Sequence, residues 1–350
     1  MSYLKSTFRH PESPKNKLGH TEAVYEGALS TLCAGCGHDS VSNSIIKACF
    51  ELSLEPHRIA KMSGIGCSSK TPAYFLKSSH GFNSVHGRMP SVATGANMAN
   101  RDLTYIGISG DGDTASIGMG QFMHLVRRNL NMVYICMNNG VYGLTKGQDS
   151  ATADVGSASK KGVPNMYEPM DLCELAISLG SGYVARSFSG DKEQLVPLIE
   201  GAIKHNGFAL IDCVSPCVTF NNTPRSTKSY EWVRDHKEAT GTVDLVPEEQ
   251  EIIVQQPDQI LESITLHDGS ILNLRRQPNS LDIQSRESVL KSLEDARQKQ
   301  QVLTGLLYLN TDSSNTHEII NTSDQPLNSM SKEDLCPGSD VLESINASLR

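Results

Sequence analysis

Apolar runs and amphipathic stretches alternate along residues 39–214 of the chain. Short apolar runs predict strands, and apolar residues spaced three and four apart predict helices. The predicted strands are 58–62, 103–109, 132–137, 182–186 and 208–214, the last of the series. The predicted helices are 39–52, with Asp39 or Ser40 as its cap, and then 91–100, 116–129, 169–179 and 192–205. Strands that alternate with helices indicate an α/β fold with a doubly wound, mostly parallel sheet.

The pattern changes after residue 223. A helix is predicted over 229–238, and His267-Asp268-Gly269 before the apolar run 271–274 is a hairpin-turn signal that follows another apolar run at 252–254. A charged helix over 286–301 and a strand over 302–309 come next. Residues 310–350 are dominated by Ser, Asn, Thr and Asp, a composition that rarely forms a core of its own.

These changes divide the chain into four parts. We expect a polar N-terminal segment (1–24), a main domain (25–240), a C-terminal extension (241–309) and a polar tail (310–350). Leu327, Leu335 and Leu342 would anchor the tail on a partner subunit. The stretch 149–166, rich in Ser, Ala, Lys and Gly, is interpreted as a mobile loop.

Composition narrows the class of protein. The chain has 350 residues, of which 38% are hydrophobic, and this suits a large globular domain. It contains no apolar run of about eighteen residues, so we expect no membrane span. The first twenty residues lack the apolar block of a secretory signal, which favours a cytoplasmic protein. A formal net charge of −8 argues against nucleic acid as the main partner.

Two polar motifs follow neighbouring predicted strands. Gly110-Asp111-Gly112-Asp113 follows 103–109, and Asn138-Asn139 follows 132–137. In a parallel sheet both motifs lie at the carboxyl edge, where α/β proteins bind phosphorylated ligands. The oxygens of Asp111 and Asn139 suit Mg²⁺, with diphosphate oxygens completing its coordination. This arrangement is typical of thiamine diphosphate enzymes, although Asp113 could instead cap the helix that follows it.

The chain has nine cysteines, an odd number that argues against a disulfide scaffold in a protein without a signal peptide. Four of them lie in loops: Cys33, Cys36, Cys67 and Cys217. Four thiolates suit either a [4Fe–4S] cluster or a structural zinc ion. The thiamine motif favours the cluster, because redox thiamine chemistry needs an electron acceptor. We interpret the others as core residues (Cys49, Cys136, Cys173 and Cys213) or as a bystander in the tail (Cys336).

The motifs together carry a resemblance over about residues 25–240. They are Cys33-Ala-Gly-Cys36-Gly-His38, Gly64-Ile-Gly-Cys67-Ser-Ser, His86-Gly-Arg88, Gly110-Asp-Gly-Asp113, Asn138-Asn139, Tyr142-Gly-Leu-Thr-Lys-Gly-Gln148 and Ser215-Pro-Cys217-Val-Thr-Phe-Asn. In this order and spacing they resemble the beta subunits of 2-oxoacid:ferredoxin oxidoreductases, and among these the 2-oxoglutarate type, also called 2-oxoglutarate synthase. The resemblance implies a thiamine diphosphate-binding fold with a C-terminal extension.

The resemblance also implies roles for individual residues. Cys33, Cys36, Cys67 and Cys217 would ligate one [4Fe–4S] cluster, while Asp111, Asn139 and the backbone carbonyl of Val141 would hold Mg²⁺. The expected contacts of thiamine diphosphate are Ile65, Gly66, Cys67, Ser68, His86, Gly112, Asp113, Gly143 and Leu144. His86 is also a catalytic candidate, and Lys70 would bind the distal carboxylate of the substrate. His86 could instead bond within its loop, and Lys70 could be a solvated surface residue.

The implied activity is the oxidative decarboxylation of 2-oxoglutarate with coenzyme A to succinyl-CoA and CO₂, with ferredoxin as electron acceptor, or the reverse reaction as CO₂ fixation. Pyruvate or a branched 2-oxoacid stays open as the substrate. A separate alpha subunit, in an αβ or (αβ)₂ assembly, would supply the activating glutamate, since Glu51, Glu168 and Glu174 lack a motif for that role. The alternative from another class is a non-redox thiamine diphosphate decarboxylase subunit with a Cys₄ zinc site.

Overall fold

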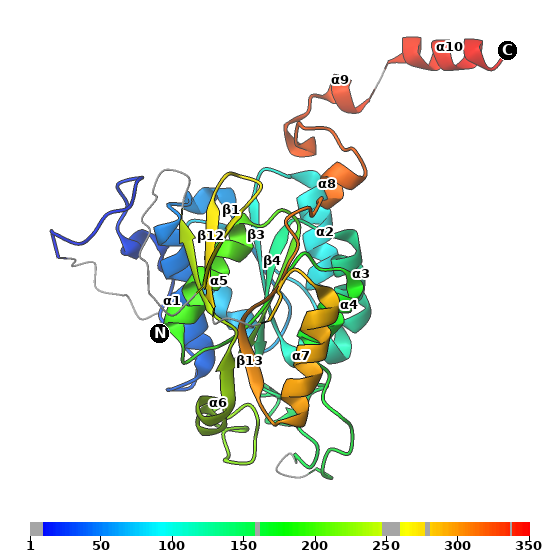
Figure 1. The fold of residues 1–350 in the computed structure, drawn as a ribbon. Coiled ribbons are helices and arrows are strands. Elements are labelled where there is room, and N and C mark those ends of the chain that lie inside the picture. The colour runs from blue at the N-terminus through cyan, green and yellow to red at the C-terminus, as the bar shows by residue number, and fades with distance from the viewer. Residues whose placement is uncertain (1–9, 158–161, 247–259, 277–280, 337) are drawn as a thin grey trace.

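A computed structural model describes residues 10–157, 162–246, 260–276, 281–336 and 338–350. An eight-stranded sheet runs through its centre in the order β2-β1-β3-β4-β8-β7-β13-β9 (Figure 1). Its strands are β1 (Ile59–Ser63), β2 (His80–Asn83), β3 (Thr104–Gly110), β4 (Met132–Asn138), β7 (Tyr183–Phe188), β8 (Phe208–Val214), β9 (Lys237–Ala239) and β13 (Val302–Leu309). All pairings are parallel except that of β13 with β7, which confirms the predicted mostly parallel sheet.

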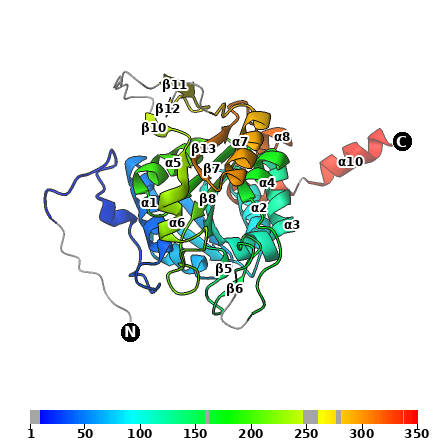
Figure 2. The same ribbon diagram turned by 60° about the horizontal axis from the view of Figure 1, so that its bottom comes forward.

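Helices cover both faces of the sheet, as a doubly wound fold requires (Figure 2). One face packs against α1 (Gly37–Glu51) and α5 (Lys192–Lys204), and α5 in turn contacts β10 (Thr242–Val246) of a small sheet. The other face packs against α2 (Met89–Ala99), α3 (Met119–Arg128), α4 (Leu172–Leu179) and α7 (Arg286–Gln298). Every residue of β4 and β8 is buried, as expected of central parallel strands covered on both sides.

Two helix predictions are wrong in detail. The first helix begins at Gly37, after Cys36, so neither Asp39 nor Ser40 caps it. Gly37 starts the helix where a Cβ would lie 2.6 Å from the hydroxyl oxygen of Ser215, so the loops meet at this point. The helix predicted over 116–129 is divided into a π-helical turn (Gly112–Ile117) and α3. The N–H of Gly118 bonds to the carbonyl of Asp113, five residues back, which ends the first turn.

The sheet does not end with β8, contrary to the prediction. The predicted strand 302–309 is β13, and it extends the sheet beyond β7. The predicted helix 229–238 is α6 (Tyr230–His236), and β9 follows it directly. A three-stranded antiparallel sheet contains β10 (Thr242–Val246), β11 (Ile260–Thr265) and β12 (Ile271–Arg276). The predicted turn joins β11 to β12, whereas the apolar run 252–254 lies outside the described residues.

The tail contains the short helices α8 (Thr316–Ile319) and α9 (Lys332–Leu335) and the longer α10 (Ser339–Ser348). α10 stands away from the body of the protein in both views (Figures 1 and 2). Leu327, Leu335 and Leu342 are all exposed. None of the helices described is long and apolar enough to cross a membrane.

Candidate cofactor pocket

A pocket opens at the carboxyl edge of the sheet, among the loops that follow β1, β3 and β4. All twelve residues predicted to contact thiamine diphosphate or Mg²⁺ line it: Ile65, Gly66, Cys67, Ser68, His86, Asp111, Gly112, Asp113, Asn139, Val141, Gly143 and Leu144. They come from four separate stretches of sequence. The fold therefore brings the predicted residues together in one pocket.

Asp111 lies at the end of β3 with 1% of its surface exposed. Its Oδ2 accepts hydrogen bonds from the hydroxyls of Ser150 and Thr152, the latter at 2.7 Å. Its Oδ1 accepts the N–H of Asn139 at 3.2 Å. Burial raises the pKa of Asp111, and the bonds from the two hydroxyls oppose this rise. The carboxylate is thus fixed in direction before any ligand binds.

The turn after β4 places an amide and a carbonyl beside Asp111. The Oδ1 of Asn139 accepts the N–H of Val141 at 3.1 Å, which folds the turn back on itself. Gly140 adopts a φ of +73°, and a Cβ there would lie 2.9 Å from the Nδ2 of Asn221. That same Nδ2 donates to the carbonyl of Asn139 at 2.8 Å. Glycine is therefore required here both by conformation and by the close approach of Asn221.

Asp113 joins three loops rather than capping a helix. Its Oδ1 accepts the N–H of Gly87 at 2.7 Å, and its Oδ2 accepts the hydroxyl of Ser109 at 3.1 Å. A Cβ on Gly64 would stand only 1.7 Å from Oδ2, so the carboxylate fills the space that a side chain at position 64 would need. The pKa of Asp113 is raised by burial and lowered in part by the bond from Gly87.

Tyr142 and Gly112 form a second close contact across the pocket. The hydroxyl of Tyr142 donates to the carbonyl of Gly112 at 3.0 Å. A Cβ on Gly112 would lie 2.4 Å from the ring of Tyr142. β5 (Val141–Tyr142) pairs with β6 (Gln148–Asp149), so the intervening loop returns toward the sheet. The hairpin holds Gly143 and Leu144 at the pocket wall.

His86 and Lys70 differ in their relation to the pocket. His86 is exposed and lines the pocket, close enough to Asp113 to lower the pKa of that carboxyl. Lys70 is exposed on the short helix Ser68–Ala73, outside the lining, and its charge lowers the pKa of Cys67. His86 is therefore placed to meet a ligand in the pocket, whereas Lys70 does not line it.

Cys67 and Cys217 lie on either side of Gly143. A Cβ on Gly143 would be 3.6 Å from the sulfur of each, so the two sulfurs share one neighbourhood beside the pocket. Burial raises the pKa of Cys67, and the nearby Cys217 and Cys33 add to the rise. Cys217 follows β8 and forms a β-bridge with Asn221, which fixes its loop.

Cys33 and Cys36, the other two of the four predicted cluster cysteines, lie in the turn before α1. The N–H of Cys36 donates to the carbonyl of Cys33 at 3.0 Å, and Thr219 donates to the sulfur of Cys33 at 3.5 Å. Burial raises the pKa of Cys36 to about 12, with Cys217 and Cys67 adding to the rise. Among the residues described, no group of three or more His, Cys, Asp or Glu side chains is arranged so that it could hold a metal ion. The four-cysteine ligand set stays a prediction. Cys49, Cys136, Cys173 and Cys213 are buried, as predicted.

Sequence reasoning missed two residues at this site, Ser150 and Thr152. Ser150 and Thr152 fall in the stretch interpreted as a mobile loop, yet both are buried against Asp111. His38 lines the pocket, and its Nδ1 lies 2.6 Å from the hydroxyl of Ser215. Burial lowers the pKa of His38 to about 4, so its ring is neutral at pH 7.

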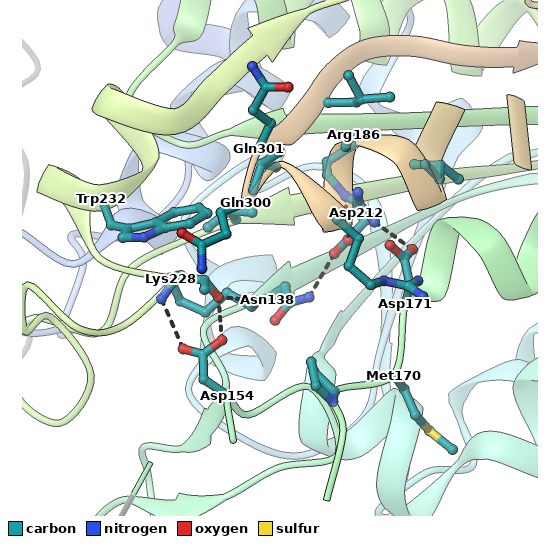
Figure 3. Close-up of a pocket in the computed structure, with 18 of the residues that line it drawn as sticks. Asn138, Asp154, Met170, Asp171, Arg186, Asp212, Lys228, Trp232, Gln300 and Gln301 are labelled. Carbon is teal, nitrogen blue, oxygen red and sulfur yellow. Dashed lines mark hydrogen bonds and ion pairs between the residues drawn. The ribbon is translucent and has the colours of Figure 1, made fainter. Parts of the chain in front are cut away.

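A second cavity, of about 410 Å³, is lined by residues of β4, β7, β8 and α7 (Figure 3). Its wall includes buried Arg186, which pairs with Asp171 through Nη2 and with Asp212 through Nε at 3.2 Å. Asn138 donates to Asp212 at 3.0 Å from the strand next to it. Arg186 therefore has two carboxylate partners, the buried Asp212 and the partly buried Asp171.

Known proteins are similar to this chain in sequence and in fold. The family described as thiamine pyrophosphate enzyme, C-terminal TPP binding domain, matches residues 64–213. The 2-oxoacid:ferredoxin oxidoreductase subunit beta of Sulfolobus sp is 40% identical over 243 residues, which are 69% of this chain and 77% of that relative. The 2-oxoglutarate synthase subunit KorB of Methanocaldococcus jannaschii is 41% identical over 189 residues, which are 54% of this chain and 69% of that relative.

A solved structure extends the likeness to the whole fold. The 2-oxoglutarate:ferredoxin oxidoreductase from Magnetococcus marinus, with 2-oxoglutarate, coenzyme A and succinyl-CoA bound, superposes with a TM-score of 0.70 and 30% identity. The superposition covers 88% of this chain and 90% of that chain. Together with the sequence relatives, this confirms the predicted resemblance: the chain belongs to the family of 2-oxoacid:ferredoxin oxidoreductase beta subunits.

Proposed function

We propose that the chain is the beta subunit of an enzyme that converts 2-oxoglutarate, coenzyme A and oxidised ferredoxin to succinyl-CoA, CO₂ and reduced ferredoxin. The observation that carries this proposal is that a single pocket collects the metal, diphosphate and thiamine candidates with Cys67 at its wall. Relatives named as 2-oxoglutarate synthase and 2-oxoglutarate oxidoreductase subunits support 2-oxoglutarate as the substrate. The proposal includes the reverse direction, CO₂ fixation, when the reductant is strong.

The donor atoms around Asp111 fit a Mg²⁺–diphosphate group. A carboxylate, an amide oxygen and a backbone carbonyl, from Asp111, Asn139 and Val141, are hard ligands of the kind that Mg²⁺ prefers. Gly112 and Gly143 line the same wall, and we assign both to contact with the diphosphate. We therefore assign Mg²⁺ and thiamine diphosphate to this pocket.

The four cysteines fit a [4Fe–4S] cluster beside the pocket. Besides burial, the nearby Cys217 and Cys67 raise the pKa of Cys36, and Cys217 and Cys33 raise the pKa of Cys67, as expected of thiols grouped in one place. Cys67 belongs both to this group and to the pocket wall, so a cluster bound there would adjoin the thiamine site. Cluster binding requires the thiolates, so assembly would release the protons that burial favours on Cys36 and Cys67.

The residues of the chain have different roles in the proposed reaction. Bound thiamine diphosphate supplies the nucleophilic carbon and the electron sink for decarboxylation, and the cluster supplies a one-electron acceptor. Asp113 holds the loops that carry Gly64 and Gly87 and so shapes the pocket. We assign His86 to contact with the thiamine or its diphosphate, and Lys70 to the distal carboxylate of 2-oxoglutarate as it enters.

A second subunit completes the proposed site. Of the residues that the structure describes, the acidic ones that line the pocket are Asp111 and Asp113. Glu174 pairs with Arg297 and Glu51 with Lys47, and Glu168 is exposed outside the pocket. We propose that an alpha subunit provides the glutamate that activates the thiamine, together with most of the coenzyme A site.

We also propose that the tail is the arm that holds this alpha subunit. Val341, Leu342 and Ile345 lie at helical spacing on α10, and Leu349 follows directly after its end; all four are exposed. An apolar stripe on a helix that leaves the body suits burial against a partner. Hydrogen exchange of 338–350 with and without the alpha subunit tests this; equal protection in both would refute it.

One experiment separates the proposed activity from its alternatives. The chain, co-purified anaerobically with its alpha subunit, is assayed for methyl viologen reduction with coenzyme A and either 2-oxoglutarate or pyruvate. We expect faster reduction with 2-oxoglutarate, and iron with acid-labile sulfide in the protein. Zinc without sulfide, and no viologen reduction, would instead identify a non-redox decarboxylase. Robust oxidation by the chain alone would contradict the proposed division between subunits.

A further inference from the structure

Ser150 and Thr152 lie where the hairpin β5–β6 returns to the sheet, with 7% and 1% of their surfaces exposed. Both hydroxyls donate to the same carboxylate oxygen, Oδ2 of Asp111. The N–H of Ser150 also donates to the carbonyl of Gly140 at 3.2 Å. These bonds occupy Oδ2, so Oδ1, which accepts only the bond from the N–H of Asn139 among the bonds described, is the oxygen with capacity left for a cation.

Thr152 also connects Asp111 to the interior of the sheet. Its hydroxyl lies 2.9 Å from the Oδ1 of Asn138 and shares its one hydrogen between that amide and Asp111. The Nδ2 of Asn138 donates to Asp212, which pairs with Arg186. The orientation of Asp111 is therefore held by a chain of contacts that ends in β8 and β7, not by one flexible loop.

We infer that Ser150 and Thr152 are positioning residues for the metal-binding carboxylate of Asp111. Both ends of the segment 141–152 lie beside Asp111. Val141, at its start, lines the pocket with Asp111 and Asn139, and Thr152, at its end, donates a hydrogen bond to Asp111. The cofactor-lining Gly143 and Leu144 lie between. The inference rests on the proposed Mg²⁺–thiamine diphosphate site.

The physical reason is the cost of burying a charge. An ionised carboxylate away from water is unfavourable unless donors satisfy its lone pairs. Two hydroxyls on Oδ2 supply these donors without occupying the oxygen that would face the metal. Removing the hydroxyl of Ser150 or Thr152 takes one hydrogen bond from the carboxylate of Asp111 and leaves that carboxylate free to rotate. Loss of partners that orient a metal ligand lowers metal affinity by about 10–100-fold.

The test uses Mn²⁺ in place of Mg²⁺. The electron paramagnetic resonance signal of free Mn²⁺ is titrated with the full chain at saturating thiamine diphosphate, which gives the Kd of the metal. Thr152→Val and Ser150→Ala should each raise this Kd at least about 10-fold. Thr152→Ser keeps the hydroxyl and should remain near wild type. Thr304→Val is the matched control, because Thr304 is a buried threonine in β13, three strands from β4.

The outcomes are distinguishable. Wild-type protein that binds no Mn²⁺ with thiamine diphosphate would overturn the proposed pocket itself. Wild-type binding with an unchanged Kd in Thr152→Val and Ser150→Ala would overturn the positioning role alone. Excess Mn²⁺ should restore full thiamine diphosphate binding to the variants; a loss that no metal concentration restores would mean general damage and would also contradict the inference. If Thr152→Val does not fold, Ser150→Ala decides by the same criterion.

Discussion

Gly64→Ala adds one methyl group, yet we expect it to disorganise the cofactor pocket. Gly64 is buried directly after β1, and its added Cβ would lie 1.7 Å from Oδ2 and 2.7 Å from Cγ of Asp113. An ordinary contact begins near 3.4 Å, so the carboxylate would have to recede by about 1.7 Å. Its bonds from Gly87 at 2.7 Å and Ser109 at 3.1 Å cannot survive such a shift.

The magnitude follows from these two bonds. Each hydrogen bond to a charged group contributes about 1.5–3 kcal/mol, and overpacking a buried site costs about 1–3 kcal/mol after relaxation. Because the loops can move partway to relieve the contact, we expect Gly64→Ala to lower the free energy of unfolding by about 2–4 kcal/mol. Displacement of the loop that carries Cys67 should weaken thiamine diphosphate binding as well.

Gly95→Ala is the matched control. A Cβ on Gly95 meets nothing within 4 Å, and the residue lies inside α2. Alanine is favoured over glycine in a helix interior by about 0.5–1 kcal/mol, so this variant should be slightly more stable than wild type. Chemical unfolding and calorimetric titration with thiamine diphosphate measure both effects. Gly64→Ala protein with wild-type stability and affinity would refute the contact on which the reasoning depends.

Three further predictions address the cluster, the pH dependence and the tail. Cys217→Ser should remove most iron and sulfide from anaerobically prepared protein, whereas Cys336→Ser, in the exposed tail, should not; equal iron in both variants would contradict the ligand assignment. Burial, with Glu51 beside it, raises the pKa of Glu200 from 4.5 to about 9. The folded state therefore binds this proton more tightly than the unfolded chain, and stability falls as pH rises from about 4.5 toward 9. Glu200→Gln should reduce that fall, which unfolding midpoints at pH 5 and pH 8 would measure, and an undiminished fall would exclude Glu200 as its source. Deletion of 338–350 should weaken association with the alpha subunit in sedimentation experiments while thiamine diphosphate binding persists; unchanged association would show that α10 is not the arm.

The position of the pocket was predictable because it depends on local sequence and one general rule. Asp111 and Asn139 each follow a continuous apolar strand, and parallel strands bring their carboxyl ends to one edge. The glycine at position 112 marks a place where the backbone comes close to a neighbour, the ring of Tyr142. These features are short-range, so the pattern of residues carries them.

Ser150 and Thr152 could not be assigned in this way. They lie in a stretch of small and polar residues, and their burial arises only because β6 pairs with β5 and returns the chain to Gly140. The same holds for β13: its apolar run predicts a strand, but its antiparallel pairing with β7 joins segments more than a hundred residues apart. The position at which α1 starts, Gly37, likewise depends on close contact with the distant Ser215. Long-range contacts decide these features, and the local pattern of residues in a single sequence does not reveal such contacts.

The central claim is that one chain holds the thiamine site and a [4Fe–4S] cluster side by side. The most direct test is low-temperature electron paramagnetic resonance of the anaerobic complex with its alpha subunit, frozen after mixing with 2-oxoglutarate and coenzyme A. We predict the signal of a reduced [4Fe–4S] cluster that requires both the substrate and thiamine diphosphate. A protein loaded with thiamine diphosphate that turns over 2-oxoglutarate but contains no reducible cluster bound to this chain would contradict the account.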